Sequence, residues 1–217
     1  MRQLKSVALG SYSSLFASLP LLLTLGCGDS GSDMMMTPVE KPLNERMVGT
    51  WESMTCESAA SFMGVSLYVK RRYQFLTPTT WQVTADLYAD QGCAFKFVTF
   101  DAKGTFTAGA LASTPAGATE LNFGLAERGT TAWLPMAKDA LNMIKCGGYT
   151  NWAVGVRQDV SSAGCDPLTP SVASCMTEYD LAQLTNASTL VLGNRGSSTT
   201  AQCTARPTTL GAPLLKL

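Results

Sequence analysis

The sequence has 217 residues, of which 46% are hydrophobic and only 15% are charged. This length and composition predict one domain with a sizeable core and leave room for a short tail. The formal net charge is zero, so a strongly basic face for nucleic acid is not expected. The chain contains no histidine, which removes the usual general base near neutral pH, the imidazole metal ligand and any Ser-His or Cys-His pair.

Residues 1–26 are typical of a secretory signal, because two early cations precede an apolar segment at about 15–25 that is too short to predict a membrane-spanning helix. The run Leu23-Thr24-Leu25-Gly26-Cys27 resembles the bacterial lipoprotein signal, in which cleavage before the cysteine follows attachment of a diacylglyceryl group to its sulfur. The resemblance implies an acylated N-terminus at Cys27 and attachment to a membrane. An ordinary exported protein, in which Cys27 only happens to follow the apolar segment, is the alternative.

Residues 27–44 predict a flexible tether between the lipid and the folded domain. Apart from three methionines they are small, polar or flanked by proline, and they show no alternation. Gly28 stands where an aspartate would, in the enterobacterial rule, favour retention in the inner membrane. We therefore expect an outer-membrane anchor, with the domain facing the periplasm or the cell surface.

From Met47 onward the hydrophobic period is two, which predicts strands. Residues 67–75 and 80–88 alternate apolar and polar side chains on either side of a turn at 76–80, and so predict a hairpin. Further strands are predicted at 93–100, 104–111, 118–125, 150–157, 175–184, 188–193 and 199–206. Many short strands at this spacing predict an antiparallel β-barrel or sandwich over residues 45–217.

One short helix is predicted near residues 135–145, where Pro135 suits the first helical turn. Apolar residues recur there at three- and four-residue spacing: Met136, Ala137, Ala140, Leu141, Met143 and Ile144. We expect this helix to close one end or side of the barrel. A helix lying on a membrane surface is the alternative, although the segment has only two lysines.

The cysteine count favours an oxidising compartment. With Cys27 set aside, six cysteines remain, an even number that predicts three disulfides. These cysteines are Cys56, Cys93, Cys146, Cys165, Cys175 and Cys203. Their spacing does not choose among the pairings, and the sequence has no Cys-x-x-Cys, so neither a metal site nor a redox-active site is expected.

Inward-facing side chains of the predicted strands are the candidates for lining a ligand cavity. They are Arg71, Tyr73, Phe75, Trp81, Val83, Leu87, Phe95, Phe97, Phe106 and Phe123. A barrel of about eight strands can hold one small ligand or fill itself with side chains, so a solid core is the alternative.

Arg71 is the one charged residue on the inward face of its predicted strand. A buried cation needs a partner, and Glu57, Glu120 or the carboxylate or phosphate headgroup of a ligand could supply it. A shift of register by one residue would instead turn Arg71 to solvent.

Sequence signatures of enzymes are missing. The chain has no Gly-x-Ser-x-Gly elbow, no phosphate-binding glycine loop and no His-Glu-x-x-His motif. We therefore expect neither an enzyme nor a cofactor.

Several motifs, in order along residues 49–214, resemble one known family. They are Gly49-x-Trp51-x-Ser53-x-x-Cys56-Glu57, Tyr73-x-Phe75, Tyr88-x-Asp90-x-x-Cys93, Gly117-Ala118-Thr119-Glu120, Cys146-Gly147, Trp152-x-x-Gly155, Cys165-Asp166, Glu178, Leu181, Leu190-x-Leu192-Gly193, Arg206-Pro207 and Pro213-Leu214. Together they are similar to the extracellular domain of the adenomatosis polyposis coli down-regulated family of Wnt antagonists. Gly49-x-Trp51 near the first strand is also a mark of lipocalin-like barrels.

The resemblance implies a lipocalin-like antiparallel barrel with an apolar cavity able to hold an acyl chain. Animal members carry two such domains and capture the lipid on Wnt, whereas this chain has one, so only the fold and the cavity carry over. The family's Cys-Asp-Cys stands here as Cys165-Asp166-Pro167, which implies Cys175 or Cys203 as the replacement bridge partner. Its Gly-Asp-Ile-His and His-Glu-Leu-Gln segments are 193–196 and 177–180 here, so a function of those histidines is not implied.

We therefore expect a single-domain bacterial lipoprotein of the cell envelope whose barrel binds a hydrophobic ligand, such as palmitate or another acyl chain or lipid. The alternative is a structural or interaction lipoprotein with a solid barrel that contacts an envelope partner of unknown identity.

Overall fold

The structure, a computed structural model, describes residues 40–59, 61–196 and 201–217. The predicted signal peptide, the predicted lipidation site Cys27 and residues 27–39 of the predicted tether lie outside the described residues. Within the described part of the chain, no helix has the length and apolar character needed to cross a membrane. The fold that follows belongs to the compact unit that begins at Glu40.

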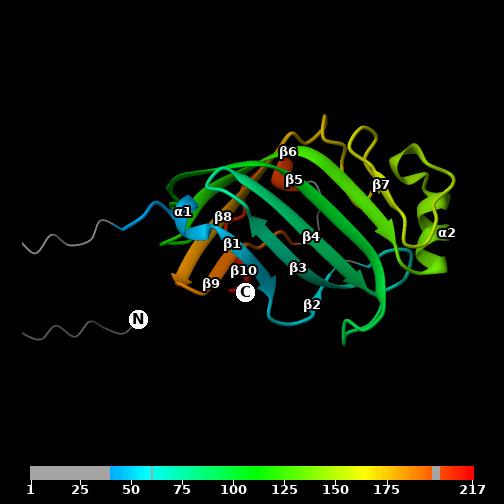
Figure 1. Cartoon of the computed structure of the whole chain (residues 1–217), viewed down its shortest axis with the longest axis horizontal. Coiled ribbons are helices and arrows are strands. Elements are labelled where there is room, and N and C mark those ends of the chain that lie inside the picture. The colour runs from blue at the N-terminus through cyan, green and yellow to red at the C-terminus, as the bar shows by residue number, and fades with distance from the viewer. Residues whose placement is uncertain (1–39, 60, 197–200) are drawn as a thin grey trace, which may run out of the picture. The chain divides into compact units, whose positions relative to one another are not determined.

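The described residues form a closed antiparallel barrel of eight strands (Figure 1). The strands pair in the order β1-β10-β9-β8-β6-β5-β4-β3, and β3 pairs back with β1. Their bounds are β1 Gly49–Ser53, β3 Tyr68–Phe75, β4 Thr80–Tyr88, β5 Lys96–Leu111, β6 Thr119–Ala132, β8 Thr177–Asn186, β9 Thr189–Gly193 and β10 Leu210–Lys216. Two short strands lie outside the ring, β2 Glu57–Ser58 on β3 and β7 Arg157–Asp159 on β6. The predicted β-barrel is therefore confirmed.

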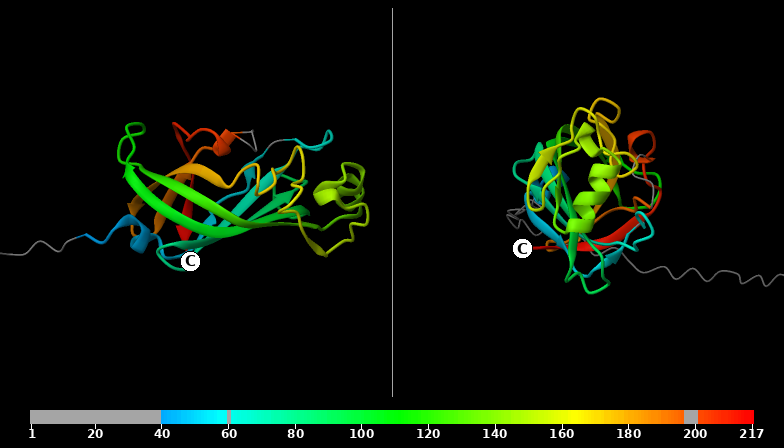
Figure 2. Two further views of the ribbon diagram at one scale, coloured as in Figure 1. Left: turned by 90° about the horizontal axis from the view of Figure 1, so that it is seen from above. Right: turned by 90° about the vertical axis from the view of Figure 1, so that its right-hand side faces the viewer.

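Two short α-helices lie at opposite ends of this barrel (Figures 1 and 2). Helix α1, Leu43–Met47, was not predicted, and α2, Pro135–Met143, confirms the helix expected near 135–145 and closes one end. The apolar stripe of α2 is narrower than predicted. Ala137 and Leu141 are buried and Ala140 and Ile144 pack beside them, whereas Met136 and Met143 are 52% and 63% exposed.

The barrel closes at the short strand β1. Trp51 of β1 lies opposite Tyr73 of β3 on one side and Lys216 of β10 on the other. Its ring is fully buried, and its Nε1 donates a hydrogen bond of 2.7 Å to the carbonyl of Met47 in α1. Gly49 has a φ of +134°, and a Cβ there would meet the Lys216 side chain at 2.7 Å. The Gly-x-Trp motif thus combines a glycine, whose positive φ suits a residue without a side chain, with a ring that packs the seam.

Strand β5 corrects one prediction, because the two strands expected at 93–100 and 104–111 are one strand of 16 residues, Lys96–Leu111, and residues 93–95 precede it. The register against β6 shifts between Lys103 and Gly104, because β6 has an extra, unpaired residue there, Ala126, which forms a β-bulge opposite Gly104. A Cβ at Gly104 would overlap the carbonyl oxygen of Gly124. The glycine therefore marks a close approach of two strands and not a turn.

Two other predicted strands are wrong. In 150–157, Val154 makes an isolated bridge and Arg157 is the first residue of β7, but the other residues are not in a strand. Trp152 instead bonds near α2, where its backbone N–H donates to the side chain of Asn142 and its indole N–H donates to the carbonyl of Cys146. The described residues of 199–206 contain a 3-10 turn at Ala201–Cys203 and no strand. Strand β10 was not predicted, because Pro213 interrupts its alternation of side chains. In the structure Pro213 lies beside a register shift between β10 and β9.

Three disulfides join the six cysteines in the pairs Cys56–Cys93, Cys146–Cys165 and Cys175–Cys203. The predicted number of bridges is confirmed. Cys175 and Cys203, the two cysteines that the resemblance offered in place of the family cysteine missing at Pro167, bond to each other, and Cys165 bonds to Cys146.

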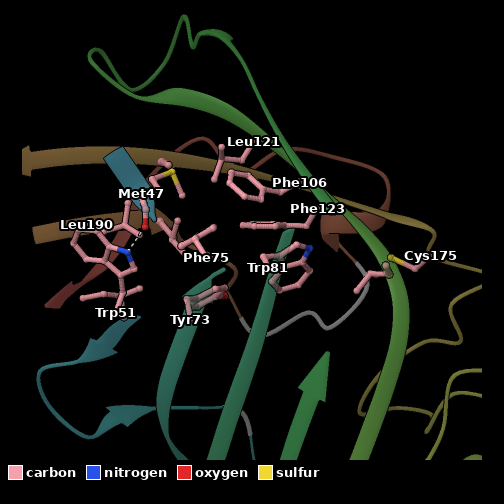
Figure 3. Close-up of a cluster of buried hydrophobic side chains, with 14 residues drawn as sticks. Met47, Trp51, Tyr73, Phe75, Trp81, Phe106, Leu121, Phe123, Cys175 and Leu190 are labelled. Atoms are coloured by element: carbon pink, nitrogen blue, oxygen red, sulfur yellow. Dashed lines mark hydrogen bonds between the residues drawn. The ribbon is translucent and has the colours of Figure 1, made fainter. Parts of the chain in front are cut away.

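The interior holds two hydrophobic clusters. The first, which we call the aromatic cluster, lies on the α1 side and is drawn in Figure 3; its rings are Trp51, Tyr73, Phe75, Trp81, Phe106 and Phe123. The second lies under α2 and includes Phe62, Leu67, Phe97, Leu141 and Trp152. Each end of the barrel is thus packed by its own set of side chains.

Removal of the Cys175–Cys203 bond is expected to lower the free energy of unfolding by about 3–4 kcal/mol, because the bond closes a sequence separation of 28 residues in the unfolded chain. The check is urea unfolding of a Cys175→Ser/Cys203→Ser double variant, followed by tryptophan fluorescence. Thiol titration of the unreduced wild type serves as the control, and a reactive thiol other than Cys27 would contradict the disulfide assignment.

Candidate functional site

A cavity of about 550 Å³ lies inside the barrel and borders both hydrophobic clusters. Strands β3, β4, β5 and β6 supply much of its wall, and residues near 57–62, 193–196 and 210–212 complete it. Known small-molecule pockets span roughly 300–1,000 Å³. The barrel is therefore hollow in one part and solid in another.

One wall of the cavity is apolar, because alternate residues of β3, β4 and β5 face inward. The register places Val69 opposite Leu87, Tyr73 opposite Val83 and Ala85 opposite Phe100. All six side chains line the cavity. The wall offers a continuous apolar surface to a ligand.

Arg71 lies on the same inward row, between Val69 and Tyr73, and faces the cavity. Its Nε donates to a carboxylate oxygen of Glu57 at 3.2 Å, and its Nη2 donates to both oxygens of that carboxylate at 2.8 and 3.0 Å. The two side chains are 14% and 18% exposed. Glu57 is therefore the partner of Arg71, whereas Glu120 pairs with Arg206 at 3.3 Å, and the register-shift alternative is wrong.

A second set of charges, which we call the interior ion network, joins β6 and β8 to the residues after β9. Arg128 Nη2 donates to Glu178 at 2.7 Å, and Arg195 donates to the other oxygen of Glu178 at 2.5 Å. Arg195 Nη2 also donates to Asp180 at 2.7 Å. Asp180 is fully buried, and its second oxygen accepts the backbone N–H of Gly193 at 2.9 Å. The network contains two cations and two anions in direct contact.

The position of Arg128 within this network costs folding free energy, because one of its buried donors has no partner among the described residues. Its Nη1 donates to the hydroxyl of Thr169 at 2.6 Å, but its Nε has no hydrogen-bond partner among the described residues and is closed to water. A buried donor without a partner costs roughly 1–3 kcal/mol. Such a departure from the rules of stable packing is typical of a functional site.

Burial and charge pairing act in opposite directions on the acids and bases of the site. Burial raises the pKa of Glu178, but the positive charges of Arg195 and Arg128 lower it by more. The net pKa therefore lies below the ordinary value of 4.5. Burial by itself lowers the pKa of Arg195, yet the charges of Tyr73 in its ionised form, Asp180 and Glu178 raise that pKa well above its ordinary value. Burial also raises the pKa of Tyr73 above 10.0. At neutral pH Glu178 and Arg195 stay charged and the hydroxyl of Tyr73 stays neutral.

The predicted lining residues divide into three groups. Five of them line the cavity, namely Arg71, Tyr73, Trp81, Val83 and Leu87. Four are buried in the clusters without lining it, namely Phe75, Phe106 and Phe123 in the aromatic cluster and Phe97 in the cluster under α2.

The placement of Phe95 inside the barrel is wrong, because this side chain is 65% exposed. Phe95 precedes β5 in a loop, where the carboxylate of Asp90 accepts its backbone N–H at 2.6 Å. The register of β4 against β5 also shifts between Leu87 and Tyr88, so the alternation does not extend back into this loop.

Sequence reasoning missed the interior ion network entirely. Glu178 and Asp180 are two residues apart on β8 and therefore share a face, and the register sets them opposite Phe123 and Leu121 of β6. The other face of β8 carries Tyr179 and Leu181, so hydrophobicity alone does not point to the acidic face as the inner one. Only the strand register identifies the acidic face as the inner one.

Protonation of Glu178 is expected to destabilise the fold in acid. Its folded-state pKa is depressed, so its stabilising contribution is present above pH 4.5 and is lost as the pH falls through the folded-state pKa. Unfolding free energies measured between about pH 6 and about pH 3 should fall for the wild type and fall less for Glu178→Gln.

At the upper end of that range, Glu178→Gln should itself cost about 3–5 kcal/mol, since it leaves buried cations undercompensated. Glu120→Gln is the control. Its carboxylate is 43% exposed in its pair with Arg206, so we expect a change of at most about 1 kcal/mol. An acid dependence in Glu178→Gln as steep as in the wild type would contradict the assignment.

A comparison with protein families supplies one match. The model of the family described as "Adenomatosis polyposis coli down-regulated 1" matches residues 33–158, more than half of the 217-residue chain. The matched segment contains β1 to β6 and α2. It therefore includes the apolar wall of the cavity, the Arg71–Glu57 pair and Arg128.

Proposed function

Because this chain belongs to the adenomatosis polyposis coli down-regulated 1 family, we propose that its barrel is a binding module that holds the apolar chain of a lipid. The observation that carries the proposal is the cavity of about 550 Å³ inside a closed barrel. A barrel filled by its own side chains would leave no such space. The proposed role is binding without catalysis.

The shape and chemistry of the cavity support an acyl chain as the ligand. Val69, Val83 and Leu87 offer only carbon atoms to the ligand, while Arg71 supplies a polar group beside them. A chain buried on the apolar wall gains about 0.8 kcal/mol for each methylene removed from water. A long-chain acyl group, such as that of palmitate, fits this description.

Filling the cavity should abolish binding. We expect Ala85→Trp to weaken binding of a fluorescent lipid probe at least about ten-fold, because the indole would occupy the apolar wall. Thr84→Trp is the matched control, since Thr84 is the neighbouring residue of β4 and is not part of the cavity lining. Native mass spectrometry of the full chain, extracted without lipid-stripping detergent, should show a bound lipid. Its absence, together with no response of the probe, would refute the proposal.

We further propose that the protein is a lipoprotein anchored in the outer membrane of the bacterial cell envelope through Cys27. The three disulfides support an oxidising compartment. The lipoprotein-like run before Cys27 supports the anchor. A lipid-binding barrel tethered to a membrane would lie next to the lipids that it is proposed to bind.

A Cys27→Ser variant should leave the membrane fraction and appear in the soluble periplasmic or extracellular fraction, because the acylated sulfur is the proposed anchor. Cell fractionation and immunoblotting test this, with Cys56→Ser/Cys93→Ser as a control that also replaces cysteines, those of one disulfide, but keeps Cys27. Retention of the Cys27→Ser variant in the membrane fraction would point to another mode of attachment.

A contact with an envelope partner is the second candidate function. One observation favours it, namely a set of exposed apolar side chains in and beside α2: Trp133, Met136, Met143, Val154 and Val156. Exposed apolar groups of this kind are frequent at protein interfaces. This candidate is compatible with lipid binding, because these side chains are not part of the cavity lining.

A further inference from the structure

We infer that the cavity selects lipids whose polar end carries no net charge and discriminates against fatty-acid anions. This inference rests on the proposed lipid-binding function and adds the class of headgroup. It comes from the way the charges around the cavity are paired.

Three guanidinium groups face the cavity, those of Arg71, Arg128 and Arg195. Each contacts a carboxylate, and the carboxylates are also three in number: Glu57, Glu178 and Asp180. The pairs are tight, with nitrogen–oxygen distances of 2.5 to 2.8 Å. Among the described lining residues, every cation therefore already has its counter-charge.

The remaining carboxylate of the cavity lining, that of Asp101, does not alter this pairing. Asp101 is a lining residue, but its oxygens accept hydrogen bonds from Arg157 at 2.6 and 3.0 Å. Arg157 is 41% exposed and is not part of the lining. The charges of the cavity wall are thus neutralised within the protein.

A fatty-acid anion would enter this cavity without a free cation to receive it. Burying an unpaired carboxylate is strongly unfavourable, and displacing Glu57 from Arg71 would leave the Glu57 carboxylate unpaired in turn. A hydroxyl, an ester or an amide needs only hydrogen bonds, which a paired guanidinium can still donate. The cavity therefore favours the uncharged end.

Glu57 offers a way to reverse this preference. Its carboxylate binds Arg71 through three hydrogen bonds at the cavity wall. Glu57→Gln keeps the shape of the side chain but removes the negative charge, so Arg71 gains an unmatched positive charge. A fatty-acid carboxylate could then take the place of the missing anion.

The experiment compares two ligands that differ only in their polar end, laurate and lauryl alcohol. Both are titrated below their aggregation concentrations at neutral pH into the full chain loaded with Nile red, a neutral probe. For the wild type, laurate should displace the probe at least about ten-fold less effectively than the alcohol. In Glu57→Gln the ratio of the two affinities should move about ten-fold or more toward laurate.

Glu52→Gln is the matched control, because Glu52 pairs with Arg72 at 3.1 Å and is not part of the cavity lining. This variant makes the same change of charge on a neighbouring strand and should leave the ratio of affinities unaltered. A gain for laurate that is specific to Glu57→Gln cannot arise from partial unfolding, since unfolding weakens both ligands.

The outcomes separate the inference from the proposed function. Equal binding of the two ligands by the wild type, or an unchanged ratio in Glu57→Gln, would overturn the headgroup inference and leave lipid binding intact. Displacement by neither ligand, with no uptake of the probe, would overturn the lipid-binding proposal itself.

Discussion

Closure of the sheet through β1 is the constraint on which the rest of the structure depends. This five-residue strand pairs with β3 on one side and β10 on the other, and so joins the beginning of the fold to its end. A seam this short gains its strength from packing, which Trp51 provides by filling the interior and bonding to α1. Without the seam, the inward rows of β3 and β4 would line an open groove and the interior charges would be exposed to water.

The closed barrel lets charges stand next to apolar side chains. Arg71 lies between Val69 and Tyr73 on one inward row, and Arg128 faces the same space from β6. Buried ion pairs add little to stability compared with apolar residues of similar volume. Their presence around a void, and not in the packed ends, indicates that the void is the part of the barrel shaped by function.

The sequence predicted those parts of the molecule in which local pattern and final register agree. The alternation in 67–75 and 80–88 predicted the β3–β4 hairpin, and Arg71 was found because it breaks that alternation. The strands expected at 93–100 and 104–111 were separated wrongly, because only the long-range pairing with β6 shows that one strand continues through Gly104. The network at Glu178 and Asp180 was missed for a similar reason. Which face of β8 points inward is decided by its pairing with β6, a segment more than fifty residues away.

The aromatic cluster limits the length of the acyl chain that the cavity could hold in the proposed lipid-binding role. Tyr73 and Trp81 belong both to this cluster and to the cavity wall, and Phe75, Phe106 and Phe123 fill the space behind them. These rings form one end of the cavity, so in the proposed lipid-binding role their combined volume limits how far an acyl chain can extend. Substitution of a smaller residue at this end would lengthen the cavity without altering its other end. Family members could in this way accommodate longer or shorter hydrocarbon tails on an unchanged scaffold.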